Sequence, residues 1–237
     1  MNLLLFGGLL VNDEITWELK ERSVDIVRFV NLTELPKEQT LGFDKAILFC
    51  MVLSRKYIQS IIRNDFQIDY DNDEYLSKEH DVEDLADWLA NFIESRGYRA
   101  HSQSEKNNAE CGYIERAYID PELQQGISIL PQKSIARLAG LGFIGKNNLL
   151  VSKDYGCAFV MCSVLTNAPV ITKDYSEIQP HCGTCDICVK SCPANALLGN
   201  EWSKKGVRED VVDVSKCCCA LRCMFLCPWT LKYANAE

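Results

Sequence analysis

The stretch CGTCDICVKSCP, from Cys182 to Pro193, places four cysteines within eleven residues and ends on a proline. Thiolates are the usual protein ligands of iron–sulfur clusters, and C-x2-C-x2-C-x3-C-P is a run that binds them. Its short spacings let three sulfurs reach one cubane from a tight loop, and the proline turns the chain away after the fourth. Structural zinc sites more often use two separated C-x2-C pairs. The stretch therefore predicts a [4Fe–4S] cluster.

A second cysteine-rich run, CCCALRCMFLCPW, begins at Cys217. We align this run with C-x2-C-x2-C-x3-C-P so that Cys227 is its last cysteine. Cys223 and Cys217 then stand at cysteine positions of the pattern, and the remaining position is an alanine. Cys219 is one position from that alanine and Cys218 is two. Either could be the missing ligand, and Cys219 is the nearer of the two. In two-cluster proteins the last cysteine of a run binds the other cluster. We predict one cluster on Cys182, Cys185, Cys188 and Cys227, and another on Cys192, Cys217, Cys219 and Cys223.

Composition places the chain among ordinary globular proteins. It has 237 residues, 47% of them hydrophobic and 24% charged, with a net charge of −8. Proteins that wrap a polyanion usually have a basic balance, so we do not expect nucleic acid as a partner. The apolar run at residues 3–11 is too short to span a bilayer and lacks a basic leader. We expect a cytoplasmic protein with no membrane partner, whose thirteen cysteines mostly serve metal.

Hydrophobic patterns predict a mixed α+β region ahead of the cysteine runs. The expected strands are residues 24–30, 46–53, 148–151 and 157–165. The expected helices are residues 56–63, 82–96, with Asp81 as cap and Gly97 as stop, and 134–139. Residues 69–79 read as a loop or helix entry and residues 103–109 as a loop. The polar stretch 167–180 is the candidate boundary between domains at 1–178 and 179–237.

A G-x-G-x-x-G motif stands at Gly140, Gly142 and Gly145, followed by Lys146. A dinucleotide site needs a strand before such a motif and a helix opening at it. Here a helical segment precedes the motif and a predicted strand follows it. The order favours a glycine-rich connector between packed elements rather than a dinucleotide site.

The sequence AGLGFIGKNNLLVSKDYG, followed by VLTNAPV and then CGTCDICVKSCPANAL, resembles epoxyqueuosine reductases and, more distantly, reductive dehalogenases. The resemblance runs from about Ser134 to Cys227. It implies a nitroreductase-like cobalamin-binding domain at 1–178, followed by a ferredoxin-like domain with two [4Fe–4S] clusters at 179–237. It also implies that an external low-potential donor, of ferredoxin or flavodoxin type, supplies electrons through the clusters to a base-off corrinoid that reduces a substrate. The implied corrinoid-binding residues are Gly140, Gly142, Gly145, Lys146, Asn147 and Leu150.

Two features depart from the epoxyqueuosine reductase pattern. An aspartate proton donor stands shortly before the glycine motif in that family, whereas the corresponding position here is Ser128 or Gly126. The nearest groups able to carry a proton are Asp120, Glu122 and His101, so no catalytic residue is assigned. The chain also ends ten residues after Cys227, as a short form without the family's C-terminal extension. We therefore expect a small-molecule substrate or a partner's corrinoid rather than tRNA.

A second function remains open from the sequence. The chain can also be interpreted as a ferredoxin-type electron-transfer protein without a corrinoid, whose larger domain docks a redox partner. Both hypotheses share the two clusters. They differ in whether the region around the glycine motif binds cobalamin.

Overall fold

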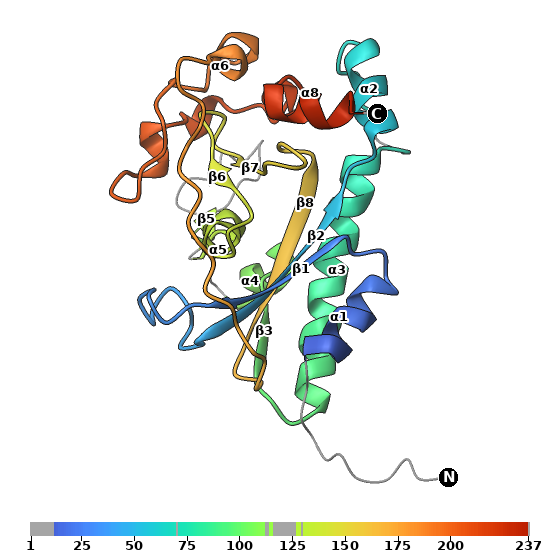
Figure 1. The fold of residues 1–237 in the computed structure, drawn as a ribbon, viewed down its shortest axis with the longest axis vertical. Coiled ribbons are helices and arrows are strands. Elements are labelled where there is room, and N and C mark those ends of the chain that lie inside the picture. Colours follow the sequence, from blue (N-terminus) through green and yellow to red (C-terminus); the bar gives the residue numbers. More distant parts are fainter. Residues whose placement is uncertain (1–11, 70, 112–113, 116–126, 129, 237) are drawn as a thin grey trace.

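The computed structural model describes residues 12–69, 71–111, 114–115, 127–128 and 130–236 (Figure 1). Its centre is a four-stranded antiparallel sheet in the order β1-β2-β8-β3. The strands are β1 (Ile26–Asn31), β2 (Lys45–Val52), β8 (Phe159–Thr166) and β3 (Ala100–Ser102). Mixed helix and sheet are thus confirmed as the fold class.

The two central strands are buried on both faces, as their uninterrupted apolar sequences predict. In β2, every residue from Ala46 to Met51 is buried, and β8 is buried along nearly its whole length. The register pairs Phe49 with Cys162 and Ile47 with Val164. The predicted strands at 24–30, 46–53 and 157–165 are therefore confirmed to within two residues.

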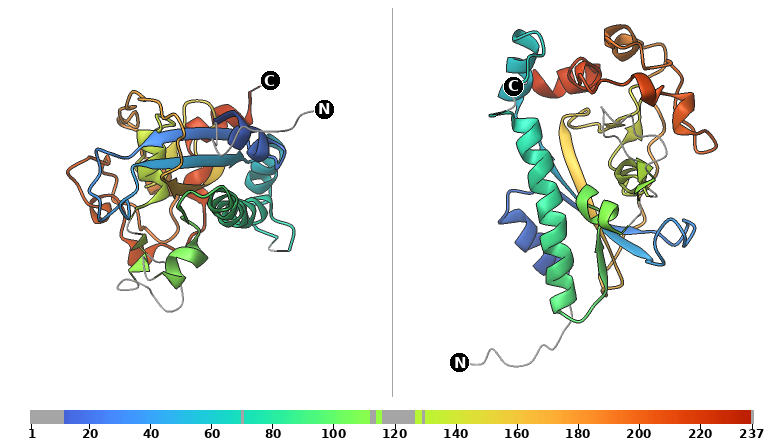
Figure 2. Two further views of the ribbon diagram at one scale, coloured as in Figure 1. Left: turned by 90° about the horizontal axis from the view of Figure 1, so that it is seen from below. Right: turned by 180° about the vertical axis from the view of Figure 1, so that it is seen from behind.

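Helices cover the two faces of the sheet unequally (Figures 1 and 2). The long helix α3 (Glu74–Ser95) and the short α1 (Asn12–Lys20) lie on one face, where Leu89 and Leu19 pack with Phe49. On the other face, α5 (Gln132–Leu138) packs Ile135 against Leu48. A hairpin of β6 (Phe143–Ile144) and β7 (Leu150–Val151) adjoins α5, and β4 (Ile114–Glu115) pairs with β5 (Ile127–Ser128).

Two sequence-based boundaries were wrong. Helix α3 begins eight residues before the predicted start, because the side chain of Asp73, and not of Asp81, accepts the Leu76 N–H and caps the helix. Its stop is confirmed, since Gly97 has a φ of 86° just past the end. The predicted loop at 103–109 contains α4 (Glu105–Glu110), whose first turn is capped by the hydroxyl of Ser104.

The cysteine-rich segment packs across one end of the sheet, next to α2 (Arg55–Arg63). Its elements are α6 (Ile187–Ser191), the 3₁₀ turns η2 (Arg208–Asp210) and η3 (Val214–Lys216), α7 (Arg222–Phe225) and α8 (Pro228–Ala234). Phe225 and Met224 share one apolar cluster with Leu53 and Val151 of the sheet region. No helix in the described part of the chain is long and apolar enough to cross a bilayer.

Candidate iron–sulfur and cofactor site

The first predicted ligand set, Cys182, Cys185, Cys188 and Cys227, is called the first thiol group below. Cys182 and Cys227 belong to the apolar cluster shared with the sheet region. Burial raises the pKa of Cys188 to about 11, and the thiols of Cys182, Cys227 and Cys185 add to that rise. The other three thiols of the set are therefore close enough to Cys188 to raise its pKa, although Cys227 comes from the second cysteine run.

The second predicted set, Cys192, Cys217, Cys219 and Cys223, is called the second thiol group. Three of its members, Cys192, Cys217 and Cys223, pack with Ala196, Leu197 and Val212 in one small apolar cluster. Burial raises the pKa of Cys223 to about 12, with a contribution from Cys217, Cys188 and Cys192. Cys188 lies in the same cluster, so the two thiol groups adjoin.

Cys219 contacts Cys217, another member of its group. A hydrogen bond from its thiol is the main reason that the pKa of Cys217 falls to about 6, and the same bond raises the pKa of Cys219. Its backbone is left-handed, with a φ of 50°, and both Cys219 and Cys218 are exposed. Within the described residues, no three His, Cys, Asp or Glu side chains converge as ligands of a single metal ion. The ligand sets stay a prediction.

Cys157 is a thiol whose place at this site the sequence did not reveal, because it precedes the cysteine runs by 25 positions. It is fully buried, and its thiol hydrogen-bonds the Cys227 sulfur. That bond and burial raise the pKa of Cys157, whereas the donated bond is the main reason that the pKa of Cys227 falls to about 7. The backbone N–H of Cys157 donates to the Thr230 hydroxyl at 2.9 Å, which ties it to α8.

Lys146 and Asn147 contact the cysteine loops. The Lys146 ammonium donates to the carbonyl oxygens of Gly183 at 2.6 Å and Cys185 at 3.3 Å, and its backbone N–H bonds the Cys182 thiol. The buried Asn147 amide donates to the Cys157 sulfur at 3.3 Å and to the Cys223 carbonyl oxygen at 3.1 Å. These predicted corrinoid-binding residues therefore join the large region to the cysteine-rich segment.

The three motif glycines and Leu150 pack against protein as well. A Cβ on Gly142 would lie 2.2 Å from the Val151 carbonyl oxygen, and one on Gly140 would lie 2.9 Å from the Tyr175 Cβ. A Cβ on Gly145 would lie 2.8 Å from the Asn147 side chain and 3.6 Å from the Cys182 sulfur. Leu150 is buried in the core beside α5. The motif is thus a tightly packed connector, as its order along the chain predicts, and corrinoid contacts at these residues stay a prediction.

A polar patch borders β8 beyond the short strand β3. Gln132 donates to the Gln103 carbonyl oxygen at 3.1 Å and to the Cys162 sulfur at 3.5 Å, and its own oxygen accepts from Ser163 at 2.7 Å. In the described residues β3 pairs with β8 only from Val164 onward. The side-chain oxygen of Gln103 is buried without a hydrogen-bond partner there. A ligand that carries amide N–H groups would match this oxygen.

Acidic side chains on α3 adjoin the same patch. The Tyr75 hydroxyl donates to Glu79 at 2.9 Å, and the carboxylate of Glu83 accepts from the Glu105 backbone N–H at 2.6 Å. Burial raises the pKa of both Glu79 and Glu83. The negative charge of Glu79 also raises the pKa of Cys219, and that of Glu83 raises the pKa of Cys162. The acidic side chains of α3 therefore form a row that extends from the cysteine-rich segment to β8.

The proton carriers considered from the sequence are only partly visible. His101 lies on β3, where Asn108 and Asn107 bond its two ring nitrogens at 3.1 and 3.4 Å. Asp120, Glu122 and Gly126 lie outside the described residues, and Ser128 is described only as part of β5. The acidic row on α3 was missed, because its four-residue spacing looks like an ordinary solvated helix face.

Comparison with curated proteins finds relatives named epoxyqueuosine reductase, and no family model matches the chain. An epoxyqueuosine reductase from Lactococcus garvieae is 47% identical over 70 residues, which are 28% of this chain and 18% of that protein. One from Synechocystis sp. is 36% identical over 101 residues, covering 41% and 31%. One from Aliivibrio fischeri is 27% identical over 146 residues, covering 62% and 33%. The chain thus matches a third or less of the length of these relatives.

Solved structures of the same kind share the fold. An epoxyqueuosine reductase crystallised with an epoxyqueuosine-modified tRNA stem loop has a TM-score of 0.57 at 15% identity, covering 92% of this chain and 65% of that one. A catabolic reductive dehalogenase has a TM-score of 0.60 at 17% identity, covering 87% and 30%. The resemblance predicted from the sequence is confirmed. The curated relatives are named as reductases, and the solved structures share the fold.

Proposed function

We propose that the chain is a cobalamin-dependent iron–sulfur reductase. Two [4Fe–4S] clusters on the two thiol groups would pass electrons to a corrinoid held beside them on the sheet region. The observation that supports this proposal is that thiols from the two distant runs pack together in two apolar clusters. Cys182 and Cys227 lie in one that includes sheet residues, and Cys188, Cys192, Cys217 and Cys223 lie in the other. The names of the relatives support the same chemistry.

The cluster region can supply what two cubanes need. Each thiol group contains three cysteines from one run and a fourth from the other, the interleaving that is typical of two-cluster proteins. Apolar side chains, among them Val212 and Phe225, pack around the thiols. Such packing excludes water, and exposure to water is one of the factors that set cluster potentials.

One observation supports a corrinoid next to β8. The buried oxygen of Gln103 lacks a partner in the described residues, and corrinoid side chains carry amide donors. Gln103 and Gln132, next to β8, would hold the group. When bound, the corrinoid would supply low-potential cobalt chemistry. Glu83 and the Tyr75–Glu79 pair lie next to this patch and would hold protons for the reduced product.

For the substrate, we propose only a chemical class. The relatives are named for epoxyqueuosine, and one solved neighbour holds a tRNA stem loop, so the expectation that nucleic acid is excluded is not confirmed. A net charge of −8 disfavours wrapping a polyanion. We propose a small electrophilic molecule or a partner's corrinoid as the acceptor, with an external low-potential protein as donor.

The test is anaerobic reconstitution of the full chain with iron, sulfide and cobalamin. We expect about eight irons with acid-labile sulfide per chain, and a cobalamin spectrum that changes on binding at a ratio near one. Zinc without labile sulfide would disprove the cluster assignment. A tRNA stem loop and a small electrophile are then offered to the loaded protein, and turnover of the stem loop alone would reassign the substrate class.

A second function is supported by a specific observation. Lys146, Asn147 and the motif glycines are all engaged in contacts within the protein. This arrangement suits an electron-transfer protein in which the large region serves as a docking platform. Intact clusters together with no cobalamin binding, by spectroscopy or calorimetry, would favour that function over the reductase.

A further inference from the structure

We infer that the large region sets the order of electron flow between the clusters, with Lys146, Asn147 and Cys157 as positioning residues that raise the reduction potential of the cluster on the first thiol group. The inference rests on the proposed two clusters and goes beyond them by assigning their order. One electron would leave the cluster on the second thiol group, which is thereby oxidised, and reduce the cluster on the first. An external low-potential protein supplies that electron.

The first thiol group receives hydrogen bonds from outside its own loops. Cys227 accepts from the Cys157 thiol and from Thr230 and the Trp229 backbone, and Cys182 accepts from the Lys146 backbone. The Lys146 ammonium adds a positive charge at the loop that carries Gly183, where the Glu201 carboxylate also accepts the Gly183 backbone N–H at 3.0 Å. Hydrogen bonds to sulfur and nearby positive charge both stabilise the reduced, more negative cluster.

The second thiol group has a different environment. Its identified donors come from its own segment: the Ala196 backbone N–H lies 3.4 Å from the Cys192 sulfur, and Cys219 donates to Cys217. A charge from the large region, the carboxylate of Glu79, raises the pKa of Cys219. A negative charge disfavours the reduced cluster. A carboxylate acts on each group, so the additional donors to Cys227 and Cys182 place the potential of the first group above that of the second.

Asn147 links the two groups physically. Its amide donates to the Cys157 sulfur beside the first group and to the carbonyl oxygen of Cys223 in the second. One buried side chain therefore fixes the Cys157 thiol against Cys227 and holds the Cys223 loop in place. Because it is 5% exposed, these bonds are shielded from competition by water.

The experiment is an EPR-monitored redox titration of the reconstituted full chain. We expect two waves in the wild type. Lys146→Met and Cys157→Ala should each move the higher wave to lower potential and leave the lower wave in place. Loss of one such interaction should lower the ratio of reduced to oxidised cluster about tenfold at fixed potential, which is about 59 mV for one electron. Lys146→Arg and Cys157→Ser keep the charge or a donor and should restore part of the shift.

The matched control is Lys190→Met, which removes an exposed ammonium paired with Asp186 on the same segment and should leave both waves unchanged. The inference fails if variants with full iron content keep both waves in place, or if the lower wave is the one that moves. If Cys157→Ala loses a cluster outright, the Cys157→Ser and Lys146 variants decide the question. Wild-type protein without labile sulfide would instead overturn the proposed clusters themselves.

Discussion

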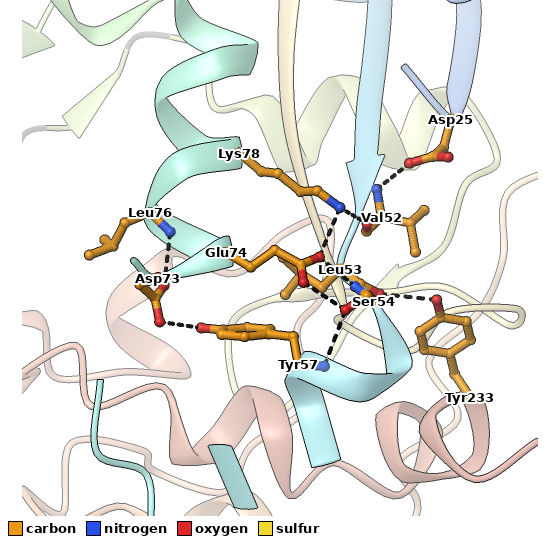
Figure 3. Close-up of polar contacts among 10 residues, drawn as sticks. All are labelled: Asp25, Val52, Leu53, Ser54, Tyr57, Asp73, Glu74, Leu76, Lys78 and Tyr233. Atoms are coloured by element: carbon orange, nitrogen blue, oxygen red, sulfur yellow. Dashed lines mark hydrogen bonds and ion pairs between the residues drawn. The ribbon is translucent and has the colours of Figure 1, made fainter. Parts of the chain in front are cut away.

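The hydroxyl of Tyr233 donates a 3.0 Å hydrogen bond to the carbonyl oxygen of Leu53, a residue 180 positions earlier in the chain (Figure 3). Tyr233 lies on α8, and the residue that precedes this helix as its cap is Cys227. Leu53 lies where β2 ends and α2 begins. The same helix is held by a 2.8 Å bond from Gln59 to the Ala234 carbonyl oxygen. The position of a predicted cluster ligand therefore depends on how α8 docks against the sheet region.

Removing this hydroxyl tests the docking. Tyr233→Phe should lower the free energy of unfolding by about 1 kcal/mol, because the partly buried Leu53 carbonyl loses its donor. Chemical denaturation of the metal-free chain measures this. Tyr155→Phe removes a hydroxyl from the ring that packs edge-on against Tyr233 at 5.4 Å and serves as control. An equal decrease in unfolding free energy in both variants would show that the hydrogen bond to Leu53 does not stabilise the docking of α8.

The choice between Cys218 and Cys219 can be decided by substitution. Cys219→Ser should cost one cluster, about half of the iron, because its thiol bonds Cys217 within the second thiol group. Cys218→Ser should leave the iron content unchanged, since Cys218 lies two positions from the register expected of a ligand. Iron and labile sulfide assays with EPR compare the two. If both variants keep all their iron, neither thiol is a ligand and the fourth ligand lies elsewhere.

The sequence predicts the sheet well because β2 and β8 are largely apolar, whereas the two thiol sets, inferred from local ligand spacing, stay a prediction. Other features depend on long-range contacts. The start of α3 was missed because its first turns are acidic and are stabilised by Ser54 and Tyr57 from another helix (Figure 3). Cys157 was missed because only folding brings it to Cys227. The contacts of the Lys146 and Asn147 side chains with the cysteine loops were not foreseen, and the corrinoid contacts expected at these residues stay a prediction.

A side chain at Gly142 should damage the connector itself. Gly142→Ala places a Cβ 2.2 Å from the Val151 carbonyl oxygen, so the β6–β7 hairpin must shift. We expect a loss of about 2–4 kcal/mol in unfolding free energy, within the range of strongly destabilising core substitutions. Gly97→Ala meets nothing within 4 Å and should cost only about 1 kcal/mol, the cost of its positive φ. If Gly142→Ala and Gly97→Ala lowered the unfolding free energy by similar amounts, the close contact at Gly142 would be contradicted.

Glu74 should stabilise the fold at neutral pH and cease to do so in acid. Partial burial alone would raise its pKa, but hydrogen bonds from Ser54 and Lys78 outweigh that effect and lower it (Figure 3). A lowered carboxyl pKa gives stability that is present above the unfolded value near 4.5 and is lost as pH falls through the folded value. Glu74→Gln should therefore lower the unfolding free energy by about 1–2 kcal/mol at pH 7.

The pH dependence supplies the check on Glu74. The difference between Glu74→Gln and wild type should shrink as the pH falls below about 4. Thermal or denaturant unfolding from pH 3 to 7 measures it. Glu94→Gln, on the exposed side of the same helix, is the control and should change stability little at any pH. A difference that stays constant with pH would mean that the ionised form of Glu74 has no part in the effect.

Glu83 should show the opposite behaviour. Burial raises its pKa, and the carboxylates of Glu105, Glu79 and Asp87 oppose its ionisation as well. A raised carboxyl pKa means that the folded state holds the proton more tightly, so stability is fully present below the unfolded value and is lost as pH rises through the folded one. Glu83→Gln removes this loss and keeps an oxygen to accept the Glu105 backbone N–H. The variant should be more stable than wild type at pH 7 and equal to it near pH 3.5.

Stability gained by removing an acid from a candidate site is the pattern expected of a functional group. The same Glu83→Gln protein should therefore keep its iron and its cobalamin binding, while its rate of substrate reduction falls about 10²-fold or more, as expected for loss of a general acid. Asp84→Asn, at a carboxylate that is 71% exposed on the same helix, should change neither stability nor rate. A Glu83→Gln variant that is less stable than wild type at pH 7 would contradict the raised pKa. One that is stabilised but fully active would remove Glu83 from the proton path and leave the Tyr75–Glu79 pair as the next candidate.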